Sequence, residues 1–418
     1  MKNNGLDTLI ERGFFKQCTN REALDKLMDQ GPITFYAGVD PTASSLHVGH
    51  MVPFFAMHHL QQAGHNPIAL VGGGTAMIGD PSGRTETRKM LSVDQISYNV
   101  SCIKKQLSSI IDFTGEDDSI GKAELVNNAD WIAPLNYIEF LRDIGKHFSV
   151  NRMLSFEGYK MRMQTGLSFI EFNYQLLQSY DFLSLFRENS CQLQIGGDDQ
   201  WANIISGVEL IRRIEGEEVY GLTFPLVTRS DGKKMGKTEK GALYLDPNLV
   251  SPFEFFQYWR NIDDKDVGRF LKLFTFLSLE EISELEKLEG KEINKAKEVL
   301  AYEYTKVIHG QDEADKAKEA ARAAFKTTGT AVDKSSLPSI EINMAELEKG
   351  IDVMDLYSRT TLCSSRSAAR RLIEQGGAYA NSAKITDINT IIDSSFVIDE
   401  EILLRAGKKR YFRIIINC

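Results

Sequence analysis

Thr34-Phe-Tyr-Ala-Gly-Val-Asp40-Pro-Thr-Ala-Ser-Ser-Leu-His47-Val-Gly-His50 is the stretch of this sequence that decides its fold. Residues 34–39 are mainly β-branched or aromatic, which predicts a strand that Pro41 ends. Thr42 and the serines after it are good helix N-cap residues, and the mostly apolar residues 50–62 predict a helix. Strand-like runs and amphipathic helices alternate up to about residue 245, which predicts a parallel α/β sheet.

The two histidines of this stretch, His47 and His50, are three residues apart and should share one face of the first helical turn. A helix N-terminus offers free backbone N–H groups and a positive dipole end to a phosphate. Two imidazoles there add donors as charge develops in a transition state. Gly49 would let a nucleotide approach the backbone closely. Chance or core packing explains an isolated His-x-Gly-His as well, and nucleotidyltransferases also contain this pattern.

A second basic string, Lys234-Met-Gly-Lys237-Thr238, follows Asp231-Gly232, and its glycines predict a loop. Lys234 and Lys237 are flexible point charges that can reach a triphosphate, and Thr238 can donate a hydrogen bond. A solvated basic loop is the alternative interpretation.

In this order and at this separation, the two strings resemble the ATP-handling motifs of class I aminoacyl-tRNA synthetases. The segments around them resemble the bacterial type of tyrosyl-tRNA synthetase along the length of the chain. The resemblance implies a Rossmann-like parallel-sheet catalytic domain, then an all-α domain and a small α+β RNA-binding domain of the αL type. It implies that L-tyrosine and ATP give tyrosyl-adenylate and pyrophosphate, and that the tyrosine then passes to tRNA(Tyr). It also implies a homodimer, and Mg²⁺ is expected to accompany the ATP.

Tyr174, Gln178 and Asp181 are spaced by four and three residues, on one face of a predicted helix. A polar surface stripe explains that spacing equally well. In the family this stripe lines the tyrosine pocket. The resemblance therefore implies that Asp181 and Tyr36 bind the substrate phenol, and that Tyr174, Gln178 and Asp80 hold its α-ammonium group.

Gln194-Ile-Gly-Gly-Asp-Asp-Gln200-Trp is predicted to be a strand end that turns into a helix, where open α/β sheets bind ligands. Its paired glycines admit a ribose, Asp199 suits ribose hydroxyls, and Gln194 and Gln200 suit polar groups of tyrosine. The residues predicted to bind ATP are Gly38, Asp40, Thr42, Gly49, Gly197 and Asp199.

Gly74 and Gly79 have the spacing of a P-loop, but Asp80-Pro81 stands where a P-loop needs Lys and then Ser or Thr. A carboxylate there would repel a phosphate and suits an ammonium group. Arg84 and Arg88 are candidate pyrophosphate contacts, although a solvated loop is the simpler explanation for each.

Composition supplies the background to these motifs. A chain of 418 residues exceeds one typical core, and 42% hydrophobic with 26% charged residues is ordinary for a globular protein. Residues 1–7 do not resemble a signal peptide, and no stretch is long and apolar enough to span a membrane. The five cysteines are scattered without Cys-x-x-Cys spacing, which predicts reduced thiols in the cytoplasm and no zinc site. No organic cofactor is expected either.

The predicted domains are a catalytic domain at 1–247, a helical anticodon-side domain at 248–325, a linker at 326–340 and an RNA-binding domain at 341–418. The helical domain ends in a long charged helical stretch at 291–325. The net charge is −9, but residues 351–418 hold 10 Lys and Arg against 8 Asp and Glu. A local basic patch is enough for phosphate contact.

Residues 364–381 resemble the αL-type RNA-binding module shared with a ribosomal small-subunit protein. Arg366, Arg370 and Arg371 fall on neighbouring helical turns and present one cationic edge. The other residues predicted to bind tRNA are Lys408, Lys409 and Arg410, near a closing strand. A solvated basic face is the alternative.

Three other functions remain open. A tryptophanyl-tRNA synthetase shares the fold and both motifs, but residues 174–181 and the RNA-binding tail favour tyrosine. A nucleotidyltransferase would have no need of residues 251–418. A non-enzymatic RNA-binding relative would be expected to have lost the histidines or lysines of the motifs, and this sequence keeps them.

Overall fold

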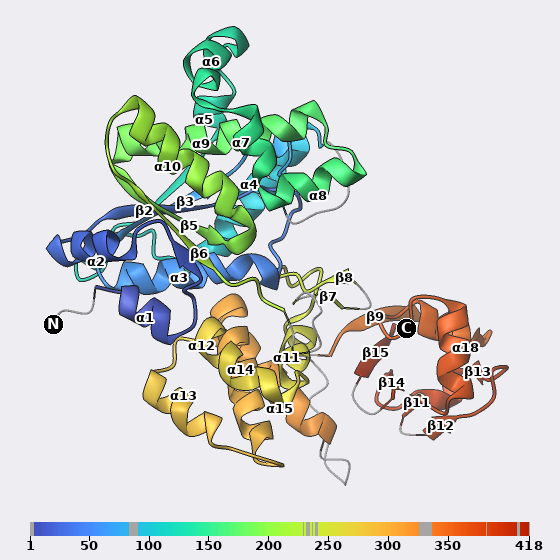
Figure 1. The fold of residues 1–418 in the computed structure, drawn as a ribbon. Coiled ribbons are helices and arrows are strands. Elements are labelled where there is room, and N and C mark those ends of the chain that lie inside the picture. Colours follow the sequence, from blue (N-terminus) through green and yellow to red (C-terminus); the bar gives the residue numbers. More distant parts are fainter. Residues whose placement is uncertain are drawn as a thin grey trace. The chain divides into compact units, whose positions relative to one another are not determined.

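The computed structural model describes residues 4–82, 91–228, 230, 235, 237–238, 241–325, 337–381, 383–407 and 410–417. Of residues 237, 238, 241 and 323–325 it describes the backbone alone. The chain divides into two compact units, one of residues 1–238, 242–246 and 263–296, and one of residues 239–241, 247–262 and 297–418 (Figure 1). The domain boundaries at 247, 325 and 340 stay predictions.

A six-stranded sheet in the order β1-β6-β5-β2-β3-β4 forms the centre of the first unit. Its strands are β1 Gln17–Cys18, β2 Thr34–Val39, β3 Asn66–Val71, β4 Glu124–Asn127, β5 Cys191–Gly197 and β6 Tyr220–Phe224. All neighbouring pairs are parallel except β1 with β6. The predicted parallel α/β sheet is thereby confirmed. Because β3 and β5 flank β2 on opposite sides, the strand order reverses between β2 and β5.

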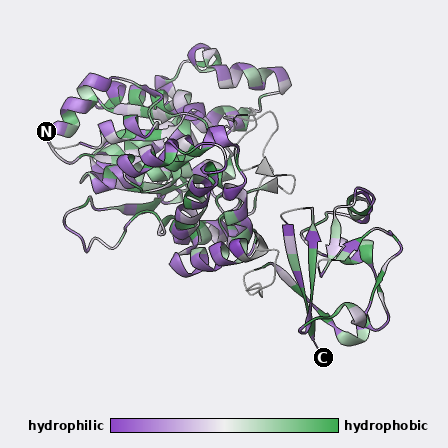
Figure 2. Ribbon diagram, turned by 90° about the horizontal axis from the view of Figure 1, so that it is seen from below, coloured by the Kyte–Doolittle hydropathy of each residue, from purple (hydrophilic) through white to green (hydrophobic). Residues whose placement is uncertain are grey.

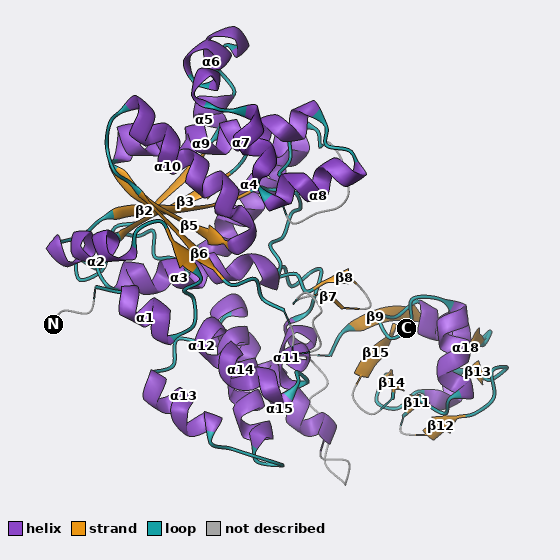
Figure 3. Cartoon of the chain, in the orientation of Figure 1, coloured by secondary structure: helices purple, strands orange, loops and turns teal. Residues whose placement is uncertain are grey.

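Helices cover both faces of this sheet, with α3 on one side and α9 and α10 on the other (Figures 1 and 3). The larger helices are α2 Arg21–Gln30, α3 Met51–Gln62, α4 Val93–Leu107, α8 Glu157–Thr165, α9 Phe169–Asn189 and α10 Trp201–Ile214. The shorter ones are α1 Leu6–Glu11, α5 Ala129–Ile132, α6 Tyr137–Asp143, α7 Val150–Ser155, α12 Val267–Phe274 and α13 Leu279–Glu286. Hydrophobic and hydrophilic residues alternate along the helices, as expected where one face of each is buried (Figure 2).

The second unit contains α11 Pro252–Arg260, residues 297–309 of α14 Ile293–His309, and α15 Gln311–Phe325, and Phe255, Trp259 and Tyr304 are buried in these helices. The helical stretch predicted at 291–325 is divided into α14 and α15 at Gly310, whose φ of +87° lies in the left-handed region that favours glycine.

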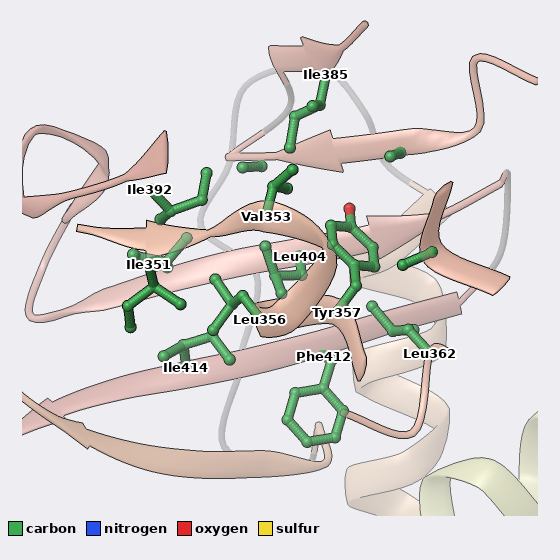
Figure 4. Packing of buried hydrophobic residues seen from close by; sticks show 14 of the residues in the cluster. Ile351, Val353, Leu356, Tyr357, Leu362, Ile385, Ile392, Leu404, Phe412 and Ile414 are labelled. Carbon is green, nitrogen blue, oxygen red and sulfur yellow. The ribbon is translucent and has the colours of Figure 1, made fainter. Parts of the chain in front are cut away.

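The C-terminal part of the second unit is a five-stranded sheet in the order β12-β11-β14-β15-β9. The strands of this sheet are β9 Ser339–Asn343, β11 Ala378–Ala380, β12 Ala383–Ile385, β14 Glu401–Ala406 and β15 Arg410–Asn417. The same part of the chain contains helices α16 Met344–Leu347, α17 Val353–Ser358 and α18 Arg366–Glu374, and a separate pair of strands, β10 Ile351–Asp352 and β13 Ile391–Ile392. Leu356 and Tyr357 of α17 pack against Leu404 and Phe412 of the sheet (Figure 4). The Tyr357 hydroxyl lies 2.8 Å from the carbonyl oxygen of Tyr379, which ties the helix to β11. This small α+β fold agrees with the sequence prediction.

Candidate active site

Polar residues gather where the parallel strands end. Asp40 follows β2, Gly72 follows β3, Asn128 follows β4, and Gly197 is the last residue of β5. These ends share one edge of the sheet, and the reversal of strand order between β2 and β5 lies among them. Open α/β sheets bind ligands at this point.

The His47-Val48-Gly49-His50 motif forms a tight turn before α3. His47 is extended and residues 48–50 form one 3₁₀ turn, so the histidines do not share a regular α-helical turn as expected. The structure nevertheless brings them together, with ring centroids 3.6 Å apart and an interplanar angle of 19°. A Cβ on Gly49 would lie 2.9 Å from His47 Cε1, so glycine at this position also makes room for the stacked rings.

Backbone hydrogen bonds join this motif to the segment that follows the second one. The Val48 N–H donates to Leu243 O at 3.1 Å, and the Leu245 N–H donates to Leu46 O at 2.9 Å. Lys234 lies outside the described residues, and only the backbone of Lys237 and Thr238 is described, in the short strand β7 Lys237–Thr238. The phosphate contacts of these three side chains stay predictions.

Tyr36 of β2, Asp181 of α9 and Gln194 of β5 are buried residues, 1%, 2% and 3% exposed. Tyr36 and Gln194 are direct neighbours across β2 and β5. Neither Tyr36 Oη nor Gln194 Oε1 has a hydrogen-bond partner among the described residues. Buried polar atoms are rarely left unpaired in native proteins, so this pair indicates a place for a polar group of a ligand.

Asp181 is held by two residues that the sequence analysis missed. Its carboxylate accepts hydrogen bonds from Asn128 Nδ2 at 3.0 Å and from Trp131 Nε1 at 2.8 Å. Burial nevertheless raises the pKa of Asp181 to about 7, because desolvation outweighs these two bonds and Asp40 adds a smaller raising effect. Burial, and next the proximity of Asp181, raises the pKa of the Tyr36 hydroxyl well above its usual range.

Asp40 connects this region to Tyr174. Its carboxylate accepts from Tyr174 Oη at 3.0 Å and from Thr75 Oγ1 at 2.7 Å, and Thr75 in turn accepts from Asn128 Nδ2 at 2.9 Å. A Cβ on Gly72 would lie 2.2 Å from Asp40 Oδ1, so glycine is required beside this carboxylate. Asp40, predicted to bind ATP, is therefore part of the same network as the predicted tyrosine-binding side chains.

The remaining predicted tyrosine-binding residues form a second polar group. Asp80 accepts from Gln200 Nε2 at 2.8 Å, and Gln178 accepts from Asn203 Nδ2 at 2.9 Å. Asn203, which the sequence analysis did not select, also donates to Gln200 Oε1 at 3.2 Å. The structure therefore brings Asp80, Gln178 and Gln200 together.

The other predicted ATP-binding residues lie at the strand ends. Gly38 and Asp199 are exposed. The Thr42 N–H donates to Asp40 O at 2.8 Å in a tight turn, and a Cβ on Gly197 would lie 2.7 Å from Asp199 Oδ1. Arg84 and Arg88 lie outside the described residues.

Within the described ranges, no group of three or more His, Cys, Asp or Glu side chains is placed to hold a metal ion. No helix among those residues is long and apolar enough to cross a membrane. Mg²⁺ is therefore expected only because it accompanies ATP, and it stays a prediction.

The predicted tRNA-binding arginines differ in their surroundings. Arg366 pairs with Asp352 at 3.2 Å and Asp355 at 2.8 Å, and Arg370 pairs with Glu374 at 2.9 Å. Arg371 is exposed and forms no ion pair with the described residues. Arg410 donates to Leu362 O at 2.9 Å, and Lys408 and Lys409 lie outside the described residues.

Two family profiles match this chain. The profile of class I tRNA synthetases (W and Y) matches residues 28–326, which is more than half of the sequence. The chain belongs to this family. The profile of the tyrosine–tRNA ligase SYY-like C-terminal domain matches residues 331–414 of this class I synthetase.

Comparison with individual proteins gives the same family. A tyrosine–tRNA ligase of Treponema denticola is 56% identical over 416 residues, covering 99% of this chain and 100% of that protein. One from Acetivibrio thermocellus is 54% identical over 408 residues, covering 98% of each. A C-terminally truncated mitochondrial tyrosyl-tRNA synthetase of Aspergillus nidulans is similar in structure, with a TM-score of 0.69 and 34% identity over 77% of this chain and 94% of that chain. The resemblance found in the sequence is confirmed.

Proposed function

We propose that this class I synthetase is a tyrosine–tRNA ligase, which activates L-tyrosine with ATP and transfers it to tRNA. The observation that carries the proposal is the pair of buried atoms Tyr36 Oη and Gln194 Oε1, which have no partner among the described residues and belong to neighbouring residues of β2 and β5, with Asp181 acting on the Tyr36 hydroxyl. A phenol hydroxyl both donates and accepts hydrogen bonds, so it suits this group. Similarity to tyrosine–tRNA ligases over 99% of the chain supports the same substrate.

In the first step, a carboxylate oxygen of tyrosine attacks the α-phosphorus of ATP. The new P–O bond forms as the bond to the pyrophosphate breaks, which gives tyrosyl-adenylate and free pyrophosphate. No side chain acts as a covalent nucleophile, so catalysis consists of positioning and charge stabilisation. The phosphate contacts are assigned to His47, His50, Lys234, Lys237 and Thr238, with Mg²⁺ accompanying the ATP and Arg84 and Arg88 as candidate pyrophosphate contacts.

In the second step, a hydroxyl of the 3′-terminal ribose of tRNA attacks the carbonyl carbon of the adenylate. An ester forms and AMP leaves with the electrons of the broken bond. The C-terminal sheet and α18 are the proposed tRNA-binding part. Because carboxylates already pair with Arg366 and Arg370, Arg371 has more of its charge available for a phosphate.

The proposed pocket is expected to reject phenylalanine. Phenylalanine would leave the Asp181 carboxyl and the Tyr36 hydroxyl buried without a substrate partner. A site built to hydrogen-bond a hydroxyl discriminates strongly against an analogue without it, and tyrosyl-tRNA synthetases are themselves the usual example.

The proposal includes a homodimer in the cytoplasm. Seven large apolar side chains between residues 137 and 170 are 38–69% exposed, namely Tyr137, Ile138, Val150, Met161, Met163, Phe169 and Ile170. Exposed large apolar side chains gathered in one part of the sequence support an interface there. A monomer in light scattering at micromolar concentration would contradict this part of the proposal.

Pyrophosphate exchange tests the function directly. The purified protein is incubated with ATP, labelled pyrophosphate and one amino acid at a time. Exchange that depends on tyrosine is expected, and exchange with tryptophan instead would overturn the pocket assignment. Deletion of residues 340–418 should leave this exchange intact and abolish tRNA charging, whereas retained charging would contradict the role given to the C-terminal part.

A further inference from the structure

A chain of hydrogen bonds runs from Asp80 to Gln178 through two other carboxamides. Asp80 Oδ2 accepts from Gln200 Nε2 at 2.8 Å, and Gln200 Oε1 accepts from Asn203 Nδ2 at 3.2 Å. The same Asn203 nitrogen donates to Gln178 Oε1 at 2.9 Å and lies 3.5 Å from Ser82 Oγ. Asn203 is 1% exposed, so bulk water does not replace these bonds.

This series of hydrogen bonds has a donor-to-acceptor direction, and Asp80 sets that direction. A carboxylate only accepts hydrogen bonds, so Gln200 must turn its NH₂ group toward Asp80. Its carbonyl oxygen then faces Asn203, which must turn its own NH₂ group toward both glutamines. Each carboxamide has two orientations of nearly equal shape, and the bonds to its neighbours decide between them. One carboxylate thereby fixes the orientation of three carboxamides.

We propose that Asn203 is a positioning residue for tyrosine activation, which transmits the hydrogen-bond direction set by Asp80 to Gln178. One lone pair of Gln178 Oε1 accepts from Asn203, and the other stays directed at the substrate α-ammonium group. Without Asn203, the Gln178 carboxamide is free to turn its NH₂ group toward that positive charge. The inference rests on the proposed function and adds a residue that does not itself touch the substrate.

The first experiment reverses the hydrogen-bonding character of Asn203 with almost no change in shape. In Asn203→Asp, a group that only accepts faces two carbonyl oxygens, so both glutamines must turn over. The KM for tyrosine in pyrophosphate exchange should rise at least about ten-fold, while the KM for ATP changes less than about two-fold. An unchanged tyrosine KM, or an equal rise in both constants, would overturn the proposal.

Gln61→Glu is the matched control. Gln61 is a fully buried carboxamide of α3 that donates to Asp112 O at 2.7 Å and Gly121 O at 3.0 Å. This variant makes the same chemical change outside the pocket. Its thermal midpoint should fall with no change in the tyrosine KM, and a similar rise in that KM would show that lost stability alone explains Asn203→Asp.

The second experiment reverses the donor-to-acceptor direction of every hydrogen bond between Asp80 and Gln178. In the double variant Asp80→Asn and Asn203→Asp, the introduced carboxamide can donate to Gln200, and both glutamines can donate to the introduced carboxylate. Its thermal midpoint should exceed that of Asn203→Asp, while the tyrosine KM stays raised because the α-ammonium group loses the Asp80 carboxylate and Gln178 now presents its NH₂ group. Midpoint changes that simply add would contradict a transmitted direction.

Asn203→Ala serves if neither carboxylate variant folds, because it removes the donor without adding charge. It should raise the tyrosine KM several-fold, and an unchanged value would overturn the proposal. If the unaltered protein shows no tyrosine-dependent exchange, the proposed function fails. If it exchanges and Asn203→Asp keeps a normal tyrosine KM, only the role of Asn203 fails.

Discussion

The two ends of the proposed tyrosine pocket differ in how many of their buried polar atoms already have hydrogen-bond partners within the protein. At the ammonium end, Asp80 and Gln178 are hydrogen-bonded through Gln200 and Asn203. At the phenol end, Tyr36 Oη and Gln194 Oε1 are buried without a partner among the described residues. Every amino acid carries an α-ammonium group, but only tyrosine carries the phenol. We therefore propose that the preformed end binds what all candidate substrates share and that the incomplete end distinguishes between them.

This difference has an energetic basis. A buried polar group without a partner costs about 1–3 kcal/mol. Tyrosine removes this cost at the phenol end, whereas phenylalanine leaves it in place. Specificity consequently depends on bonds that the substrate completes.

The largest expected effect on the reaction rate comes from two lysines that belong to neither end of the tyrosine pocket. Lys234→Ala and Lys237→Ala should each lower the rate of adenylate formation by about 10²–10³-fold, since they remove transition-state charge stabilisation. Tyrosine affinity, measured by equilibrium dialysis, should change less than about two-fold. An equal loss of rate and affinity would place these lysines in the pocket and remove the contrast between binding and catalysis.

Asp181→Asn tests the electrostatics of the phenol end. The pKa of Asp181 is raised from 3.8 to about 7 in the folded protein, so the folded state binds this proton more tightly than the unfolded state. The free energy of unfolding should therefore fall by about 4 kcal/mol as the pH rises from about 4 to 7, and Asp181→Asn should lack this decrease. Urea unfolding at several pH values measures the difference, with Gln178→Ala as a non-titrating control at the ammonium end. Parallel curves for Asp181→Asn and the unaltered protein would refute the assignment.

Tyr36→Phe should have the smallest effect and sharpens the comparison. Removal of a buried hydroxyl without a partner should stabilise the free protein by about 1 kcal/mol. The same change should raise the KM for tyrosine about ten-fold, equivalent to about 1.4 kcal/mol, and leave that for phenylalanine unchanged. Thermal unfolding measures the change in stability, and exchange kinetics measure the change in KM. An equal rise in the KM values for tyrosine and phenylalanine would show that the Tyr36 hydroxyl does not recognise the substrate phenol.

Local sequence was sufficient to predict the elements that carry the motifs. The strand predicted at 34–39 is β2, and the helix predicted at 50–62 is α3 Met51–Gln62, because propensity and a local stop signal determine both. The helical stretch predicted at 291–325 is two helices, of which the first begins at Ile293, separated at Gly310. That glycine takes a positive φ, which an isolated glycine in a helical pattern does not reveal.

The supporting residues of the pocket could not be predicted in this way. Asn128 and Trp131 reach Asp181 across 53 and 50 residues of sequence. Their only local signal is the end of β4 Glu124–Asn127, a short edge strand without a clear apolar alternation. Asn203 is one polar residue on the amphipathic helix α10, and its importance follows from tertiary contacts with Gln178 and Gln200.

The most direct test of the contrast between the two ends is the ratio of kcat/KM for tyrosine to that for phenylalanine, measured by pyrophosphate exchange in Asp181→Ala and in Gln178→Ala. We expect Asp181→Ala to reduce the ratio by at least about 100-fold, because the phenol loses its carboxyl partner while phenylalanine loses nothing. Gln178→Ala should weaken both substrates alike and leave the ratio within about three-fold of the unaltered protein. An unchanged ratio in Asp181→Ala, or an equal reduction in both variants, would contradict the assignment of specificity to the phenol end.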